Sequence, residues 1–247
     1  MIKEIKDFYK KTKINFGKPI EMVEDFQWPL NWIKIFFKIY PRMPKIGLKR
    51  PRIDGELHSL LYNRKSNREY LDVPISFTQL NEIIFYSTGI RNPSEQLDKT
   101  QRFYPSAGAR YPIEIYLISN NVQNLARGLY HYNVKQNELE ILLNKDLRIK
   151  SSRIFGDANW NNPNFIILTG VIGRTEVKYG INAYRFALIE AGHIGQNISL
   201  LSEKQNIGSC ALGGFDNDEL ENLLDLTEEE IPLYAFSLGK PAISINS

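Results

Sequence analysis

In several parts of the chain, apolar residues recur every three or four positions, as they do on one face of a helix. This pattern predicts helices over residues 2–12, 30–40, 55–64, 76–89 and 182–205, and a further helix after Asp216. Ser76 with Gln79, and Asp216 with Glu219, have the spacing of a capping box. The segment 182–205 is the longest and has a wide apolar surface, so it is expected to lie in the core.

Other segments have the patterns of strands. Alternation predicts a strand over 112–119, and residues 128–132 and 138–143 are expected to pair as a hairpin. Residues 165–172 form a nearly continuous apolar run between Pro163 and Gly173, which is typical of a buried central strand. The run 231–238 predicts a terminal strand. Helices and strands together indicate an α+β domain over residues 54–247.

Residues 1–53 differ from the remainder in charge and composition. They hold 13 Lys and Arg against 5 Asp and Glu, a balance of +8, whereas the remainder holds 18 against 23, a balance of −5. Prolines interrupt an aromatic-rich stretch here, and its apolar area favours an arm that packs on the body over a free linker. The cations are dispersed instead of forming a block, so no nucleic-acid partner is predicted.

Composition excludes several kinds of chemistry. Cys210 is the one cysteine of the sequence, which rules out an internal disulfide and a thiolate metal cluster, and three scattered histidines do not favour a metal site. No apolar stretch is long enough to span a membrane, and the N-terminus lacks the apolar core of a signal peptide. A cytoplasmic protein without a membrane association is therefore expected. The glycine fingerprints of nucleotide-binding loops are absent as well.

A cluster of cations follows the helix predicted at 55–64. Arg64, Lys65 and Arg68, with Ser66 and Asn67 between them, form a grip for an anion, because the fork of arginine matches phosphate oxygens. The alternative is a solvated cap, since cations also favour the C-terminal end of a helix.

Three further motifs contain glycine and other small residues. Pro105-Ser106-Ala107-Gly108-Ala109 leads into the strand at 112–119, and the absence of bulky side chains lets the backbone approach a flat ligand. Gly213-Gly214-Phe215-Asp216 precedes the last predicted helix, and Leu238-Gly239-Lys240-Pro241 ends the terminal strand.

Taken together, these motifs resemble the FMN-dependent nitroreductase superfamily and, more narrowly, the SagB-type dehydrogenases, which oxidise azoline rings to azoles in ribosomally made peptides. The resemblance covers nearly the whole chain, because Trp28-Pro29, Lys38-Ile39-Tyr40 and Pro41-Arg42 are also similar to the leader region of that subfamily. It implies a nitroreductase-like fold with a central mixed sheet flanked by helices, and an intertwined homodimer with two interfacial FMN sites.

The resemblance also implies a role for each motif. Arg64, Lys65, Ser66 and Arg68 would hold the phosphate and ribityl chain of FMN. Pro105, Ser106, Ala107 and Gly108 would lie against flavin bound mainly to the other subunit. Gly213 and Gly214 would offer backbone N–H groups near the flavin N5 edge, and Lys240 would add a cation at the phosphate. Classical nitroreductases continue their basic motif further, whereas here only residues 241–247 follow Lys240.

A second constellation, Lys178-Tyr179-Gly180, lies between the central strand and the long helix. SagB-type enzymes resemble this sequence in placing a catalytic Lys-Tyr pair there. Azoline oxidation removes a ring proton, which a lysine can accept while a tyrosine hydroxyl positions or relays it. The alternative is an exposed loop lysine beside a packing tyrosine, the commoner meaning of this dipeptide.

The sequence therefore predicts an FMN-dependent azoline dehydrogenase, with a peptide substrate and an association with a cyclodehydratase complex. Two alternatives stay open: an NAD(P)H-dependent nitro or quinone reductase, and an inactive scaffold subunit of a peptide-modifying complex. Glu190, His193 and Asn197 are expected on one helix stripe at a subunit contact. Cys210 is read as a small buried residue.

Overall fold

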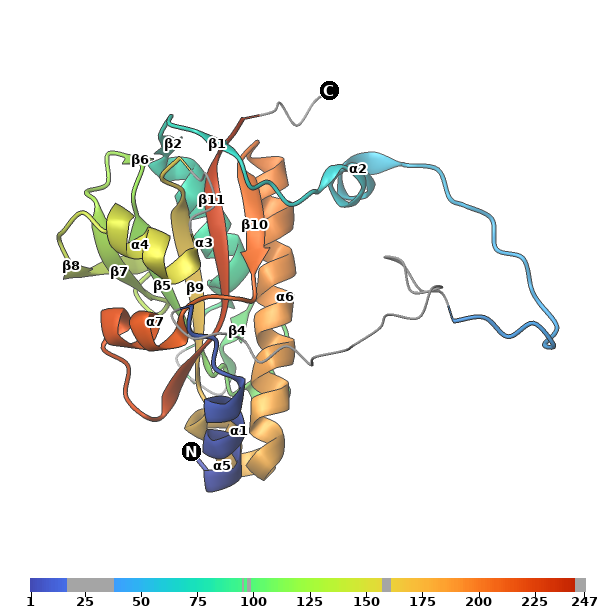
Figure 1. Cartoon of the computed structure of the whole chain (residues 1–247). Coiled ribbons are helices and arrows are strands. Elements are labelled where there is room, and N and C mark those ends of the chain that lie inside the picture. Colours follow the sequence, from blue (N-terminus) through green and yellow to red (C-terminus); the bar gives the residue numbers. More distant parts are fainter. Residues whose placement is uncertain (17–37, 95, 97–98, 157–160, 243–247) are drawn as a thin grey trace, which may run out of the picture.

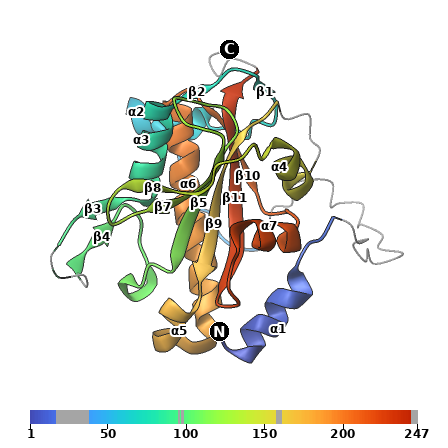
Figure 2. The same ribbon diagram turned by 90° about the vertical axis from the view of Figure 1, so that its left-hand side faces the viewer.

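The computed structural model describes residues 1–16, 38–94, 96, 99–156 and 161–242. A seven-stranded sheet lies at the centre, with helices on both of its faces (Figures 1 and 2). The helices are α1 (Lys3–Thr12), α2 (Gly55–Asn63), α3 (Phe77–Thr88), α4 (Arg148–Phe155), α5 (Gly173–Tyr179), α6 (Ala183–Lys204) and α7 (Asn217–Leu224), with short 3-10 turns η2 (Ala107–Ala109) and η3 (Gly180–Asn182). This arrangement is the predicted α+β class.

The strand order of the central sheet is β1-β11-β9-β5-β7-β8, and β10 pairs with β11 as well. Its strands are β1 (Tyr70–Leu71), β5 (Ile113–Ser119), β7 (Gly128–Asn133), β8 (Glu138–Leu143), β9 (Asn164–Val171), β10 (Gly208–Leu212) and β11 (Glu230–Pro241). Two small sheets pair β2 (Ile75–Ser76) with β6 (Val122–Gln123) and β3 (Ile90–Asn92) with β4 (Gln101–Arg102).

The described strands pair in both directions, but the parallel pairing lies outside the central sheet, for which the resemblance implied mixed strands. Every pairing within the described part of the central sheet is antiparallel, and the parallel pairing lies between β2 and β6. The apolar run at 165–172 indicated burial on both faces, which β9 has, and such a run does not fix strand direction.

Side chains of β5 alternate between two cores. Ile113, Ile115 and Leu117 enter the core between the sheet and helices α3 and α6. Tyr116 and Ile118 enter the core on the other face, with α4 and α7. The two-residue period of a strand therefore divides the apolar residues between two layers of helices, as the alternation predicted.

The predicted caps form with one difference. Ser76 and Gln79 make both hydrogen bonds of a capping box at the start of α3. Asp216 accepts from the Glu219 N–H at the start of α7, whereas the Glu219 carboxylate pairs with Lys150 instead of completing a box. The long helix α6 starts and ends within one residue of its predicted bounds.

The described parts of the predicted arm behave in two ways. Helix α1 packs on the body through buried Ile5 and Tyr9. Residues 38–54 are exposed, lie away from the body and lead back toward it to α2, which has no buried residue within this chain (Figure 1). The helix predicted at 30–40 falls mostly outside the described residues.

Among the described residues, no helix combines the length and apolarity that crossing a bilayer requires. Among these described residues, no three His, Cys, Asp or Glu side chains form a group that could hold a metal ion.

Candidate active site

The small-residue motif at 105–109 forms a tight turn that needs glycine. Gly108 has a φ of 60°, and Ala109 and Tyr111 also lie in the left-handed region, with φ of 53° and 48°. The Ser106 carbonyl accepts the Ala109 N–H at 3.1 Å, and the Ser106 hydroxyl accepts the Tyr111 N–H at 2.9 Å. Ser106 thus closes the turn at both of its oxygen atoms.

The Lys178 and Tyr179 side chains lie against this turn. A Cβ built on Gly108 would lie 2.8 Å from the Tyr179 hydroxyl oxygen and 3.0 Å from Lys178 Nζ, so both side-chain ends occupy the space that glycine leaves. Tyr179 is held by an edge-to-face contact with Phe186, with ring centroids 4.9 Å apart. Lys178 is exposed in the single chain and Tyr179 is half-buried. The fold thus joins two motifs that are about 70 residues apart in sequence.

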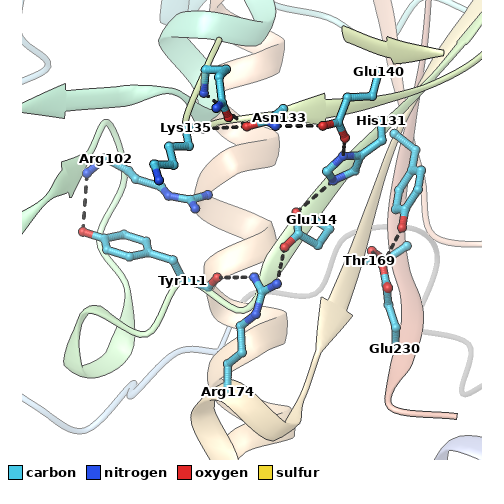
Figure 3. A network of polar contacts seen from close by, with 12 residues as sticks. Arg102, Tyr111, Glu114, His131, Asn133, Lys135, Glu140, Thr169, Arg174 and Glu230 are labelled. Atoms are coloured by element: carbon cyan, nitrogen blue, oxygen red, sulfur yellow. Dashed lines mark hydrogen bonds and ion pairs between the residues drawn. The ribbon is translucent and has the colours of Figure 1, made fainter. Parts of the chain in front are cut away.

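Helix α5, which carries this pair, is fixed by a polar network (Figure 3). Arg174 donates to the Tyr111 carbonyl at 3.3 Å and forms an ion pair with Glu114 at 2.5 Å. Glu114 also contacts His131 Nε2 at 3.1 Å, and His131 Nδ1 lies 2.8 Å from Glu140. The network therefore connects α5 and the segment after the turn to strands β5, β7 and β8.

The charges in this network are matched. Burial alone would raise the pKa of Glu114, but the hydrogen bond with His131 and the charge of Arg174 outweigh it and lower that pKa. The hydrogen bond with Glu114 raises the pKa of His131, and Glu140 adds to the effect.

Glu190 of α6 lies on the buried side of the turn. Unlike Glu114, it forms no ion pair or hydrogen bond through its side chain among the described residues. The residue is 2% exposed, and neither carboxylate oxygen has a hydrogen-bond partner among the described residues. Burial raises the pKa of Glu190 to about 7, against the opposing influence of Ser106 and the Arg102 charge. The Ser106 hydroxyl is close enough to favour the ionised form, although the geometry of a hydrogen bond is not met.

The cation cluster lies at the other end of α6. Lys65 and Arg64 act electrostatically on Glu203, near the C-terminal end of that helix. The Asn67 N–H donates to the Ser209 carbonyl of β10 at 2.8 Å, which anchors the cluster. Leu71 of β1 pairs with Lys240 of β11, so the predicted terminal cation lies at the same end of the sheet.

The cations of the cluster form no ion pairs within the part of the chain that the structure describes. Among the described residues, none of Arg64, Lys65, Arg68 and Lys240 forms an ion pair with an acidic side chain. Lys65, Ser66, Arg68 and Lys240 are exposed, and Arg64 is half-buried. Unpaired cations beside a hydroxyl are suited to hold an anion.

Gly213 and Gly214 form an exposed stretch of backbone between β10 and α7. Nothing described lies within 4 Å of a Cβ built on Gly213, and a Cβ on Gly214 would meet Ile14 at 3.7 Å. Buried Phe215 and the cap Asp216 anchor the chain directly after them. A ligand can therefore approach the backbone of these two glycines without meeting a side chain.

A single chain does not bring all of these groups together. Lys178 and Tyr179 precede the first residue of α6, whereas Arg64 and Lys65 act near its last turn. Glu190, beside the turn, and Glu203, beside the cluster, are 13 residues apart on α6, which is about 20 Å along the helix axis. The turn and the cation cluster are thus too far apart to contact the same end of one small ligand.

Two predictions about other residues have different outcomes. Glu190 is buried inside the chain while His193 is exposed, so the two do not share one outward-facing stripe, and Glu190 is not available for a subunit contact. Cys210 is buried at 2% exposure, as predicted, and burial raises the pKa of its thiol. Sequence reasoning missed Arg102 and Tyr104, although both directly precede the turn.

Comparison with known proteins gives a family match over most of the chain. The sequence profile described as "Nitroreductase family" matches residues 61–240. A protein of Methanocaldococcus jannaschii named "Putative nitroreductase MJ1384" is 27% identical over 191 residues, which cover 75% of this chain and 91% of that protein.

Two further matches concern peptide modification. The microcin B17-processing protein McbC of Escherichia coli is 28% identical over 138 residues, 53% of this chain and 51% of McbC. A solved structure of the E. coli microcin synthetase McbBCD complex with truncated pro-MccB17 bound has a chain that superposes with a TM-score of 0.74 at 20% identity. This superposition covers 96% of the present chain and 91% of the other, and it shows a shared fold.

Proposed function

The chain belongs to the nitroreductase family, and from that premise we propose that it is an FMN-dependent dehydrogenase that oxidises azoline rings to azoles in a peptide. The observation that carries the proposal is the contact of Lys178 and Tyr179 with the turn at Gly108. This contact puts a proton acceptor and a hydroxyl beside a backbone surface open to a flat ligand. The likeness to the microcin B17-processing protein McbC supports the same substrate class.

The residues that fit FMN form two separate groups in the chain. The unpaired cations Arg64, Lys65 and Arg68, with Ser66 and Lys240 near them, would hold the phosphate and the ribityl chain. Gly213 and Gly214 would offer N–H groups to the flavin ring without steric hindrance. The turn from Pro105 to Gly108 is the second group, and it would cover the flavin ring. When bound, FMN supplies a two-electron acceptor.

The distance between the two groups favours a homodimer. Because the turn lies beside Glu190 and the cations lie beside Glu203, about 20 Å further along α6, each site would take the cluster from one subunit and the turn from another. Leu57 and Leu61 of α2 are 60% and 50% exposed, so α2 has an apolar face without a partner in its own chain. We propose that a second copy covers this face.

In this proposal the chemistry of Lys178 is proton removal. Conversion of an azoline to an azole loses two electrons and two hydrogens, one as a hydride to the acceptor and one as a proton from a ring carbon. The Lys178 amine takes that proton, and the Tyr179 hydroxyl, held by Phe186, orients the ring or relays the proton. Lys178 is exposed in the single chain, so the bound ring and the second subunit must exclude water from it.

Lys178→Ala tests the proposal. The variant should purify with as much FMN as the wild type, because Lys178 lies far from the cation cluster. Its oxidation of a thiazoline-containing peptide should fall by about 10² to 10⁴, the usual loss when a positioned base is removed, which equals about 3 to 5 kcal/mol of barrier. Oxidation at near the wild-type rate would disprove the assignment.

Two controls complete this experiment. Lys145→Ala removes an exposed lysine directly after β8, at the end of the sheet where β5 ends and opposite the turn that precedes β5, and should keep full activity. The double variant Arg64→Ala with Arg68→Ala should lose FMN. Wild-type protein that takes up no FMN from an excess of it would contradict the whole proposal.

The peptide substrate and further subunits are part of the same proposal. The solved complex with the similar fold contains a bound pro-peptide, so we propose a peptide partner and a cyclodehydratase-type assembly here. A second candidate function is nitro or quinone reduction with NAD(P)H, favoured by the match with the M. jannaschii protein over 91% of its length. Turnover of a quinone that is unaffected by Lys178→Ala would favour this second function.

A further inference from the structure

An unpaired buried acid lies behind the turn of the proposed site. We propose that Glu190 is a positioning residue, which acts through the Ser106 hydroxyl to set the conformation of the turn at 105–109 against which Lys178 and Tyr179 lie. The inference deepens the proposed function, because it rests on the same turn, but its first test needs no flavin.

The first argument is the cost of an unpartnered carboxyl. Both oxygens of Glu190 are buried without a hydrogen-bond partner among the described residues, which is expensive unless the group has a role or changes state. Glu114 shows that this same region can satisfy a glutamate fully, with Arg174 and His131. The lack of a partner at Glu190 is thus not a general property of this part of the fold.

The second argument is the path from Glu190 to the proposed catalytic pair. Ser106 lies beside Glu190 and accepts the Tyr111 N–H, and two residues later Gly108 contacts both Lys178 and Tyr179. A change in what Ser106 bonds to would shift the turn, and a shift at Gly108 would displace both side chains. Glu190 itself does not reach Lys178, so its action is indirect.

The third argument concerns the charges around Glu190. The charge of Arg102 of β4 acts to lower the pKa of Glu190. The charge of Glu190 in turn acts to raise the pKa of Tyr104. No charged group of α3, α5, β5 or β11 shifts the pKa of Glu190 among the described residues. Arg102 is engaged elsewhere: it donates to the Tyr104 hydroxyl at 3.0 Å and lies over the Tyr111 ring at 4.9 Å.

These contacts give the two charge states of Glu190 different consequences. The neutral acid leaves Arg102 on Tyr104 and Tyr111, which is the arrangement observed. The carboxylate would draw the Arg102 guanidinium and the Ser106 hydroxyl proton toward itself, because a buried negative charge recruits donors. With a pKa of about 7, Glu190 changes between these states near neutral pH.

Hydrogen–deuterium exchange of the full chain tests the inference. Backbone exchange over residues 103–111 is measured one pH unit below and one unit above the Glu190 pKa of about 7, in wild type and in Glu190→Gln at each pH. The amide mimics the neutral acid, so the ratio of wild-type to variant exchange should rise severalfold at the higher pH. A ratio that stays constant would overturn the proposal.

Two further variants control for misfolding and for a general effect of acids on α6. Glu203→Gln alters another α6 glutamate whose pKa burial raises, but it lies at the far end of the helix and should keep the wild-type pH response. Ser106→Ala removes the proposed intermediary and should abolish the response without altering the core. If Ser106→Ala retains the full response, the route through Ser106 is wrong.

A final measurement separates this inference from the proposed function. The dissociation constant of FMN is measured over the same pH range. If the turn responds to pH but FMN does not bind, the proposed function fails and the role of Glu190 stands. If FMN binds and the turn does not respond, the role of Glu190 fails and the proposed function stands.

Discussion

Two glutamates flank the segment from Arg102 to Tyr111, and the fold gives charged partners to one of them and none to the other. Glu114 lies in a closed network in which Arg174, His131 and Glu140 match one another (Figure 3). Glu190 lies on the other side with both oxygens unpaired. The same residue type therefore has a lowered pKa in one place and a raised pKa in the other.

The difference separates a supporting region from a responsive one. A polar network whose members are all satisfied is rigid, and here it holds α5 and the carbonyl of Tyr111 in place. A buried acid without a partner carries a cost that depends on its charge, so its surroundings respond to pH. Lys178 and Tyr179 lie between the two, on a helix fixed by the first region and against a turn that the second can move.

Removing the carboxylate of the network should have the largest effect. Glu114→Ala leaves Arg174 and His131 without their shared partner, and breaking a largely buried pair of this kind costs about 3 kcal/mol once the partial exposure of Arg174 is allowed for. Urea unfolding at neutral pH should show this loss. A loss below about 1 kcal/mol would mean that the network is not a support.

The corresponding change on the other side should have the opposite sign. Between its ordinary pKa of 4.5 and its native pKa of about 7, the native Glu190 keeps a proton that the unfolded chain releases, so wild-type stability falls as pH rises through that window. Glu190→Gln cannot ionise and should gain stability relative to wild type by up to about 3 kcal/mol above the window.

Melting curves at several pH values measure this difference. The gain should be small at the acid end, where both side chains are neutral, and should grow toward pH 7. Glu114→Gln provides the matched control, because the same substitution removes a paired charge there and should destabilise the protein. If both variants shift stability in the same direction, the contrast between the two regions is wrong.

A third prediction concerns the turn between the regions. In Gly108→Ala the new methyl group would meet the Tyr179 hydroxyl and Lys178 Nζ, and a φ of 60° is unfavourable for alanine by about 1 to 2 kcal/mol. We expect a modest stability loss and a larger loss of azoline turnover, and turnover is expressed per bound FMN because the turn would also cover the flavin ring.

The matched control for the turn is Gly213→Ala. Nothing described lies within 4 Å of a Cβ there, so the substitution should leave the fold unchanged and affect FMN affinity alone. Wild-type turnover in Gly108→Ala would show that Lys178 and Tyr179 adjust freely.

Much of the fold could be predicted because the local signals agree with the tertiary structure. The period of two along β5 divides between two cores, and the caps at Ser76 and Asp216 start helices where their spacing indicated. The exposure of α2 could not be foreseen, since its leucine spacing says that a face is apolar but not what covers it. The directions of the strand pairs were likewise not encoded in any single apolar run.

Less of the site could be predicted, for a physical reason. Sequence motifs named the turn, the Lys-Tyr pair and the cations, but no spacing states that Gly108 contacts Lys178 or that the cations lie at the other end of α6. Glu190 was assigned to an outward stripe with His193 by its three-residue spacing, which fixes neighbours on a helix and not the face that is buried. Its lack of a partner depends on tertiary packing.

The smallest expected effect is the pH dependence of the closed network. The hydrogen bond with Glu114 raises the pKa of His131 above 6.5, so protonated His131 contributes stability that is full below 6.5 and is lost as pH rises through its native pKa. His131→Gln should remove this dependence, at a cost under about 1 kcal/mol, because His131 is partly exposed. The measurement is best made in a Glu190→Gln background, since Glu190 contributes a loss of the same sign in an overlapping range. If His131→Gln leaves the remaining slope of stability against pH unchanged, the charge of His131 does not stabilise the network, and the comparison then rests on the Arg174–Glu114 pair.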